Sequence, residues 1–212
     1  MPLTKPLLLL DVDGVLCPKG PGPAEPMRTL VIDGWPIVFS KRLPARLARL
    51  SEHSMLVWAT SFEHAANRAL APARGLPDLP FVSFAGASSR RGRTWKLAAV
   101  KRSVGERPVA WVDDELGGNA QAWAATRPQP TLLLDVNPSW GFAESHVDLL
   151  LAFAAQIPDT RAGGAHRDAR SYLPAAVAAI RRSRLVDGLH AGFGVVYRLR
   201  SRVARGGWPS RS

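Results

Sequence analysis

The chain of 212 residues is short of cysteine, of long apolar segments and of acidic residues. Its single cysteine, Cys17, excludes an intramolecular disulfide and is typical of a reducing compartment, so we expect a cytoplasmic protein. No apolar run approaches the roughly 18 residues that a transmembrane helix needs. The leucines that precede Asp11 are too few for the core of a signal peptide. The sequence therefore argues against a membrane-spanning or a disulfide-stabilised protein.

The shortage of acidic residues is concentrated at one end of the chain. Lys and Arg number 28 and Asp and Glu 17, which gives a formal net charge of +11. Residues 1–158 carry 17 basic and 14 acidic residues, whereas residues 159–212 carry 11 arginines and 3 acidic residues. We therefore predict a folded domain over 1–158 and an Arg-rich tail over 159–212, with one helix over 171–186 and otherwise flexible. The tail could bind the phosphate backbone of a nucleic acid, or act only as a solvating or dispensable extension.

What the chain does contain is a set of short apolar runs that end in polar side chains. The first is Leu7–Leu10, which is followed by Asp11, Asp13 and the turn residue Gly14. A fully apolar run of this length is typical of a buried parallel strand. Carboxylates at its end lie where open α/β sheets place their ligand sites, and their mutual repulsion favours a bound cation. The alternative is a strand that simply ends in a polar Asp-Gly turn.

Two further apolar runs and one lysine extend this pattern along the chain. They are residues 56–59 followed by Thr60 and Ser61, Lys96 at the start of a helical stretch over 96–101, and residues 109–112 followed by Asp113 and Asp114. Taken singly, each has a simpler explanation. A lone lysine is usually solvated, a threonine after a strand can cap a helix, and an acidic pair can complement a helix dipole.

Taken together, the order Asp-x-Asp, Thr/Ser, Lys, Asp-Asp resembles the haloacid dehalogenase-like (HAD) superfamily of phosphohydrolases. The resemblance covers roughly residues 5–155 and implies a Rossmann-like, three-layer α/β sandwich around a central parallel sheet. It also implies a magnesium-dependent phosphatase that works through an aspartyl-phosphate. The second aspartate, Asp13, argues against a dehalogenase, because the dehalogenases of this family lack it and need no metal.

The resemblance assigns roles to the carboxylates. Asp11 would be the nucleophile that attacks phosphorus, and Asp13 the general acid and base. Mg²⁺ would bind the carboxylate of Asp11, the backbone carbonyl of Asp13 and the later acidic pair. We expect Asp114 to be the direct ligand and Asp113 to orient a metal-bound water, with the reverse order as the alternative.

The resemblance also assigns the groups that hold the phosphoryl oxygens. Thr60 would donate a hydrogen bond to one of them, with Ser61 as the alternative because strand ends are uncertain by about a residue. Lys96 would neutralise charge there and on Asp11.

The segments between these motifs leave no room for a large cap domain. Residues 29–32 and 37–39 flank Asp33-Gly34-Trp35-Pro36 and predict a small β-hairpin, which would act as a flap. Residues 41–53 and 62–70 predict helices, and residues 79–84 and 132–136 predict further strands. The site is therefore expected to be open to solvent, unless an oligomer or the substrate covers it.

The resemblance implies a large phosphorylated substrate, because HAD members with a minimal cap often act on one. We favour the end of a polynucleotide, since HAD-like domains also occur in RNA-repair proteins. Trp35 at the hairpin tip and Arg93, in a run of arginines before Lys96, are candidate substrate-binding residues. The competing interpretation is a non-enzymatic module on the same scaffold that binds nucleic acid or a protein partner through its basic tail.

Overall fold

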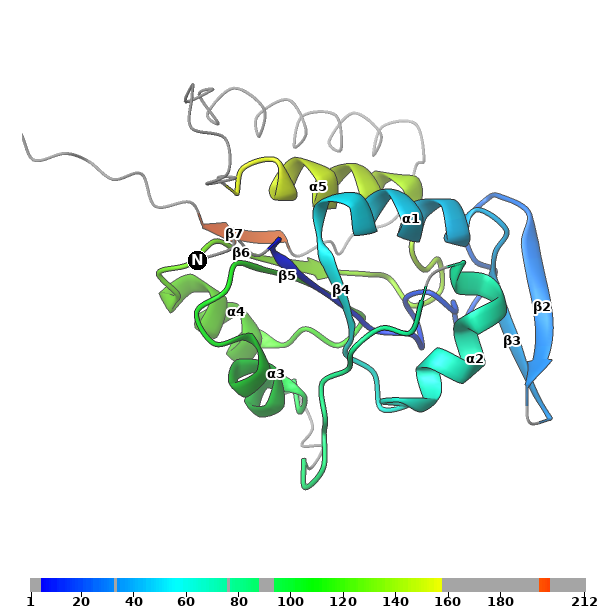
Figure 1. Cartoon of the computed structure of the whole chain (residues 1–212), viewed down its shortest axis with the longest axis horizontal. Coiled ribbons are helices and arrows are strands. Elements are labelled where there is room, and N and C mark those ends of the chain that lie inside the picture. Colours follow the sequence, from blue (N-terminus) through cyan, green and yellow to red (C-terminus); the bar gives the residue numbers. More distant parts are fainter. Residues whose placement is uncertain (1–4, 33, 76, 88–93, 158–194, 199–212) are drawn as a thin grey trace, which may run out of the picture.

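The computed structural model describes residues 5–32, 34–75, 77–87, 94–157 and 195–198, and its centre is a five-stranded sheet (Figure 1). The strand order is β4-β1-β5-β6-β7. The strands are β1 (Leu7–Leu10), β4 (Met55–Trp58), β5 (Val109–Asp113), β6 (Thr131–Asp135) and β7 (Val195–Arg198). The first four are parallel to one another, and β7 is antiparallel to β6.

The leucine run of β1 forms an interior strand of the sheet, between β4 and β5, because it is apolar on both faces. Leu8 and Leu10 pack into one hydrophobic cluster, and Leu7 and Leu9 into the other. Successive side chains of a strand point to opposite faces, so a strand with helices on both sides needs this unbroken apolar run. All four residues are buried, as the sequence predicted.

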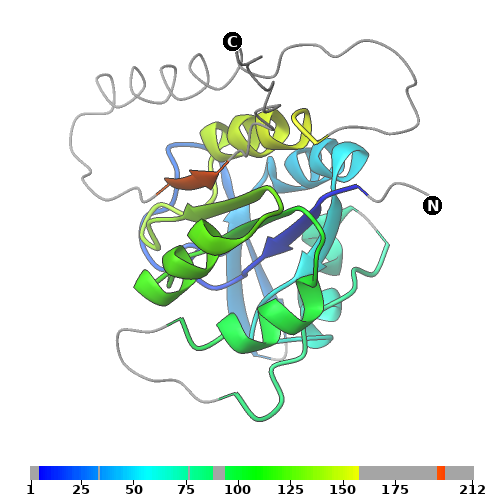
Figure 2. The same cartoon turned by 90° about the vertical axis from the view of Figure 1, so that its left-hand side faces the viewer.

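Helices cover both faces of the sheet (Figure 2). On one side lie α1 (Leu43–His53), α2 (Ala65–Arg74) and α5 (Glu144–Ala154), and on the other lie α3 (Leu97–Val104) and α4 (Gly118–Thr126). The prediction of an α/β fold with a central parallel sheet between helices is therefore confirmed. Within the residues that the structure describes, no helix is both long enough and apolar enough to cross a lipid bilayer.

The predicted β-hairpin is present as β2 (Met27–Ile32) and β3 (Trp35–Ser40). The two strands pair from Met27 with Ser40 to Ile32 with Trp35, so two residues form the turn. Gly34 in this turn has φ of +83°, a conformation that glycine adopts at little cost. The hairpin and α1 occupy most of the segment between β1 and β4, and no cap-sized insertion lies among the described residues there.

Two of the predicted elements differ in the structure. Residues 79–84 do not form a strand, and only Phe81 makes an isolated bridge, to Trp58. Pro80 has no N–H to donate, which limits the pairing to two hydrogen bonds with Trp58. The helix expected to begin at residue 62 begins instead at Ala65, because residues 61–64 form a turn.

The C-terminal segment contributes one strand that the sequence analysis did not predict. β7 adds to the edge of the sheet beside β6, where Leu132 pairs with Tyr197. A run of four residues in a segment rich in Gly and Arg carries too little periodicity to be recognised in advance. The predicted helix over 171–186, and the rest of the Arg-rich tail with its proposed affinity for nucleic acid, lie outside the described residues.

Candidate functional site

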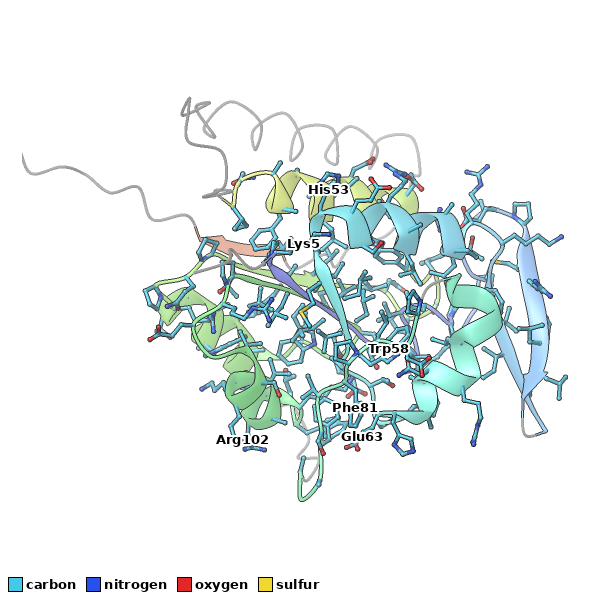
Figure 3. All side chains as sticks on the ribbon, viewed as in Figure 1. Lys5, His53, Trp58, Glu63, Phe81 and Arg102 are labelled. Carbon is cyan, nitrogen blue, oxygen red and sulfur yellow. The ribbon has the colours of Figure 1, made fainter. Side chains whose placement is uncertain are left out.

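The candidate site lies at the carboxyl edge of the parallel strands. Because β1, β4 and β5 run in the same direction, Asp11, Thr60 and Asp113 all come at this edge. The hydrogen bonding between β1 and β5 extends as far as Asp11, whose N–H donates to the carbonyl of Val112 at 3.0 Å. Figure 3 shows the two edges through labelled side chains. Lys5 and His53 mark the amino edge, and Glu63 follows the carboxyl end of β4.

The alternation of side chains along a strand sets the direction of the Asp11 and Asp113 side chains. Asp11 continues the alternation of Leu7 and Leu9, and Asp113 continues that of Val109 and Trp111. These apolar residues pack into the cluster beneath α3 and α4. Both carboxylates therefore lie on the α3 side of the sheet, where the residue before α3 is Lys96.

Lys96 joins these two carboxylates. Its Nζ lies 2.6 Å from Oδ2 of Asp11 and 2.8 Å from Oδ2 of Asp113. All three side chains are buried, with Asp113 fully so. The explanation of Lys96 as a solvated surface charge is therefore wrong, and the sequence-based expectation that it neutralises Asp11 agrees with this ion pair. The ammonium lies between two buried carboxylates and partly neutralises both.

The segment that carries Lys96 is fixed to the loop after β5. The Thr94 hydroxyl donates to the carbonyl of Glu115 at 3.0 Å and accepts from the N–H of Gly117 at 2.6 Å. The Asn119 side chain accepts from the N–H of Thr94 at 2.9 Å. These bonds hold the start of α3 against the chain that follows the acidic pair. The lysine and Asp113 are thereby positioned by one local network.

Asp113 has little capacity left for another partner. Its Oδ2 accepts from Lys96 and, at 3.2 Å, from Nε1 of Trp111, and its Oδ1 accepts from the N–H of Glu115 at 3.0 Å. Burial raises the pKa of Asp113 to about 7 although Lys96 opposes the shift. Burial likewise raises the pKa of Asp11. The Asp113 carboxylate is thus held in place by three hydrogen bonds.

Asp114 has a different environment. Its Oδ2 lies 2.7 Å from Nζ of Lys19, whose side chain is half exposed. Burial alone would lower the pKa of Lys19, but the hydrogen bond to Asp114 raises it. The acidic pair does not begin a helix, because α4 starts at Gly118 and has no acidic residue in its first turn. The helix-dipole explanation of this pair is therefore wrong.

Lys19 and Asp135 are two neighbours of the site that sequence reasoning missed. Asp135 ends β6 directly beside Asp113 in the ladder. Burial raises the pKa of Asp135 to about 6, and Asp114 adds to the shift. The only signal for Asp135 was its place at the end of a predicted strand. Lys19 lies in a loop without periodicity, and nothing in its surroundings indicated a contact with Asp114.

Three carboxylates converge closely enough to hold one cation. Asp11, Asp113 and Asp114 each offer an oxygen, and these oxygens all lie within 4.8 Å of one another. Hard divalent cations take carboxylate ligands of this kind. The donor set therefore fits an ion such as Mg²⁺. Of the acidic pair, Asp113 accepts three hydrogen bonds, whereas Asp114 is held by its ion pair with Lys19. The expectation that Asp114 is the direct ligand stays a prediction.

The remaining predicted site residues are placed less centrally. The Asp13 side chain is exposed and lies outside the carboxylate cluster, and partial loss of hydration raises its pKa although Lys19 opposes the shift. Thr60 is buried, and its Oγ1 accepts only a long 3.4 Å bond from the N–H of Phe62, while Ser61 is exposed. The structure describes Trp35 only as the first residue of β3. Arg93 lies outside the described residues.

Gly14 makes the close approach between the first loop and Asp114 possible. Its φ is +76°, and a Cβ there would lie 2.1 Å from Oδ2 of Asp114. A side chain at this position would therefore be strained in its backbone and would also push Asp114 out of place.

Replacing Gly14 by alanine is expected to lower the free energy of unfolding by about 2–4 kcal/mol, which combines backbone strain with the clash at Asp114. Gly34→Ala is the matched control, because Gly34 has a φ of +83° with nothing within 4 Å of the new Cβ. It should cost only about 1–2 kcal/mol. Urea unfolding of both variants measures the difference. Equal losses would show that Asp114 moves aside freely.

No protein-family model matches this chain, and no curated protein matches it. The geometry of the site therefore carries the functional argument.

Proposed function

We propose that this protein is a magnesium-dependent phosphatase of the HAD type, with a Rossmann-like core and a hairpin flap in place of a cap. The observation that carries the proposal is the buried Lys96 between Asp11 and Asp113, with Asp114 completing a cation site. A carboxylate cluster with an adjacent ammonium suits a reaction in which an anionic nucleophile approaches an anionic phosphate. Residues 5–157 supply all of these groups.

In the proposed reaction the carboxylate of Asp11 attacks phosphorus and forms an aspartyl-phosphate, and water then hydrolyses it. Asp11 is held in place by the N–H of Val12, which donates to its Oδ1 at 2.8 Å, and by Lys96 on its Oδ2. A bound Mg²⁺ would neutralise charge on the phosphoryl oxygens. Asp11 and Asp114 would hold it, together with the backbone carbonyl of Asp13.

Asp13 and Thr60 complete the proposed mechanism. The raised pKa of Asp13 keeps a larger share of its carboxyl protonated, which suits a group that protonates the leaving oxygen and then accepts a proton from water. The Thr60 hydroxyl accepts from the N–H of Phe62, so its hydrogen can be directed toward a phosphoryl oxygen. Both groups belong to the same edge of the sheet as Asp11.

The proposal is tested by phosphate release from a panel of esters, with small monoesters beside 5′- and 3′-phosphorylated oligonucleotides, in Mg²⁺ and in EDTA. We expect release in Mg²⁺ and a loss of at least about a hundredfold in EDTA, because Lys96 and Lys19 carry two positive charges against three carboxylates and leave none for the phosphate. The ester that is hydrolysed fastest identifies the substrate class. Release that is unaffected by EDTA would exclude the metal-dependent mechanism, and silence across the panel would favour the binding-module interpretation.

Mg²⁺ should also stabilise the fold, because it relieves repulsion among Asp11, Asp113 and Asp114. At a concentration about a hundred times the dissociation constant, the free energy of unfolding should rise by about 2.7 kcal/mol. Thermal unfolding with increasing Mg²⁺ measures this gain without any substrate. Asp114→Asn should remove most of it, whereas Asp148→Asn, an exposed site on α5, should keep it. A gain that is equal in both variants would place the cation elsewhere.

A further inference from the structure

A second concave feature lies away from the carboxylate cluster, between the hairpin and the start of α1. It is a pocket of about 460 Å³ lined by Arg28, Phe39, Lys41 and Pro44. Phe39 is buried and forms part of the hydrophobic core, so one wall of the pocket is fixed. The size is in the range of small-molecule sites. Two of its four lining side chains are cationic.

Arg28 lies on the inward face of the hairpin. It pairs directly with Phe39, and the next pair on the same face is Leu30 with Ile37, both of which pack against the core. Directly opposed residues in an antiparallel pair share a face. The outward face carries exposed residues such as Val31. Arg28 is nevertheless exposed, as is Lys41, so both cations remain accessible from solvent to an anionic ligand.

The positive charge of this pocket is not neutralised by the described part of the chain. Neither Arg28 nor Lys41 forms an ion pair with a described carboxylate. Glu25, just before β2, is engaged by Arg46 in two bonds of 2.6 and 2.7 Å. Its other cationic neighbour, Arg42 at 3.9 Å, adds further positive charge. The pocket therefore attracts an anion.

The pocket is joined to the candidate active site by a braced segment. The loop that carries Asp13 and Lys19 ends in Glu25, and Arg46 fixes Glu25 to α1 while also donating to the carbonyl of Phe142 at 3.1 Å. In Figure 1 the hairpin stands beside the start of α1, on the side of the sheet toward which β1 runs. The hairpin thus stands toward the end of the sheet at which Asp11 lies.

We propose that the pocket of Arg28 and Lys41 binds a second phosphate group of the substrate, which makes molecules with several phosphates the preferred class. This inference rests on the proposed function, because the first phosphate is the one that Asp11 attacks. The ring of Pro44, which is partly exposed beside the buried Phe39, offers apolar contact to the group that carries the second phosphate.

The test compares 5′-phosphorylated tetrathymidylate with thymidine 5′-monophosphate, because successive phosphates of the tetramer sample several distances from the first. In the double variant Arg28→Gln, Lys41→Gln, we expect KM for the tetramer to rise about tenfold and kcat to stay unchanged. KM for the mononucleotide should not move. The double variant Lys101→Gln, Arg102→Gln is the control, since it removes the same charge from two exposed positions on α3. Figure 3 labels Arg102 on this helix.

A second arm measures binding without turnover, by fluorescence anisotropy of a labelled tetramer in EDTA. The pocket variant should bind about tenfold more weakly than the wild type, and the control variant should bind like the wild type. Equal losses in both variants, no loss in either, or no binding to the wild type would overturn the inference. Binding lost only in the pocket variant, with no phosphate release from any ester, would support the pocket and refute the phosphatase.

Discussion

Asp11→Asn is expected to lower phosphate release by roughly 10⁴-fold or more, which is the scale of loss when a covalent nucleophile is removed. The amide is isosteric with the carboxylate but is a poor nucleophile. Lys96 keeps its 2.8 Å contact with Asp113, so the buried ammonium stays paired. The variant should therefore fold, and the loss should appear in kcat.

The control for this variant is Asp148→Asn, the same chemical change at an exposed position on α5. It should retain the activity of the wild type. Phosphate release is measured with the best ester of the panel in Mg²⁺, and circular dichroism compares the folded states. The aspartyl-phosphate mechanism is falsified if a folded Asp11→Asn protein keeps more than a few per cent of the wild-type rate.

The sheet could be predicted because its strands carry their own signal. Leu7–Leu10 is apolar on both faces, and such a run has few alternatives to a central parallel strand. The stretch from residue 79 to 84 is also largely apolar, but Pro80 has no N–H to donate and Phe81 is left exposed. Local composition is therefore enough to predict a strand that pairs with a neighbour on both sides. It is not enough where a proline interrupts the hydrogen bonding to the neighbouring strand.

The central part of the site could also be predicted, because topology brings the strand ends together. Parallel order places Asp11 and Asp113 at one edge, and alternation turns both toward the helix that follows Lys96. The distinction between Asp113 and Asp114 follows from where β5 ends. Asp113 is its last residue and contacts Lys96, whereas Asp114 lies in the loop that follows and is paired with the half-exposed Lys19.

The contacts from the loops could not be predicted. Lys19 lies in a segment whose path depends on turns and on the anchoring of Glu25 by Arg46, which joins residues far apart in sequence. No periodicity specifies such a path. The same is true of the pocket beside the hairpin, because the direction of Arg28 depends on the register of β2 and β3. Register follows from the turn length, which was predicted too long by two residues.

Lys96→Met is expected to destabilise the protein by about 3–5 kcal/mol near pH 8 in EDTA. The lysine is the ammonium partner of two buried carboxylates, at 2.6 Å from Asp11 and 2.8 Å from Asp113. Without it, both must either remain charged and desolvated or take up protons. Lys101→Met is the control, because Lys101 lies in α3, which directly follows Lys96, and is exposed. Its cost should be within about 0.5 kcal/mol of zero.

The loss of unfolding free energy in Lys96→Met should depend on pH, because Asp11 and Asp113 take up protons as the pH falls. Burial already raises the pKa of Asp11 and brings that of Asp113 to about 7, so the folded state holds more protons than the unfolded state above about pH 4. This contribution to stability therefore falls as pH rises through that window. Lys96 opposes both shifts, so its removal raises both pKa values further and extends the window upward.

The deficit of Lys96→Met against the wild type should accordingly be largest near pH 8 and shrink toward pH 5, where the unpaired carboxylates are protonated. Lys96 itself does not reverse this trend, because its raised pKa keeps it charged throughout the range. Urea unfolding of the wild type, Lys96→Met and Lys101→Met at both pH values measures the difference. A deficit that stays constant with pH would mean that the lysine contributes packing alone, and that the carboxylates it contacts are not held as a charged cluster.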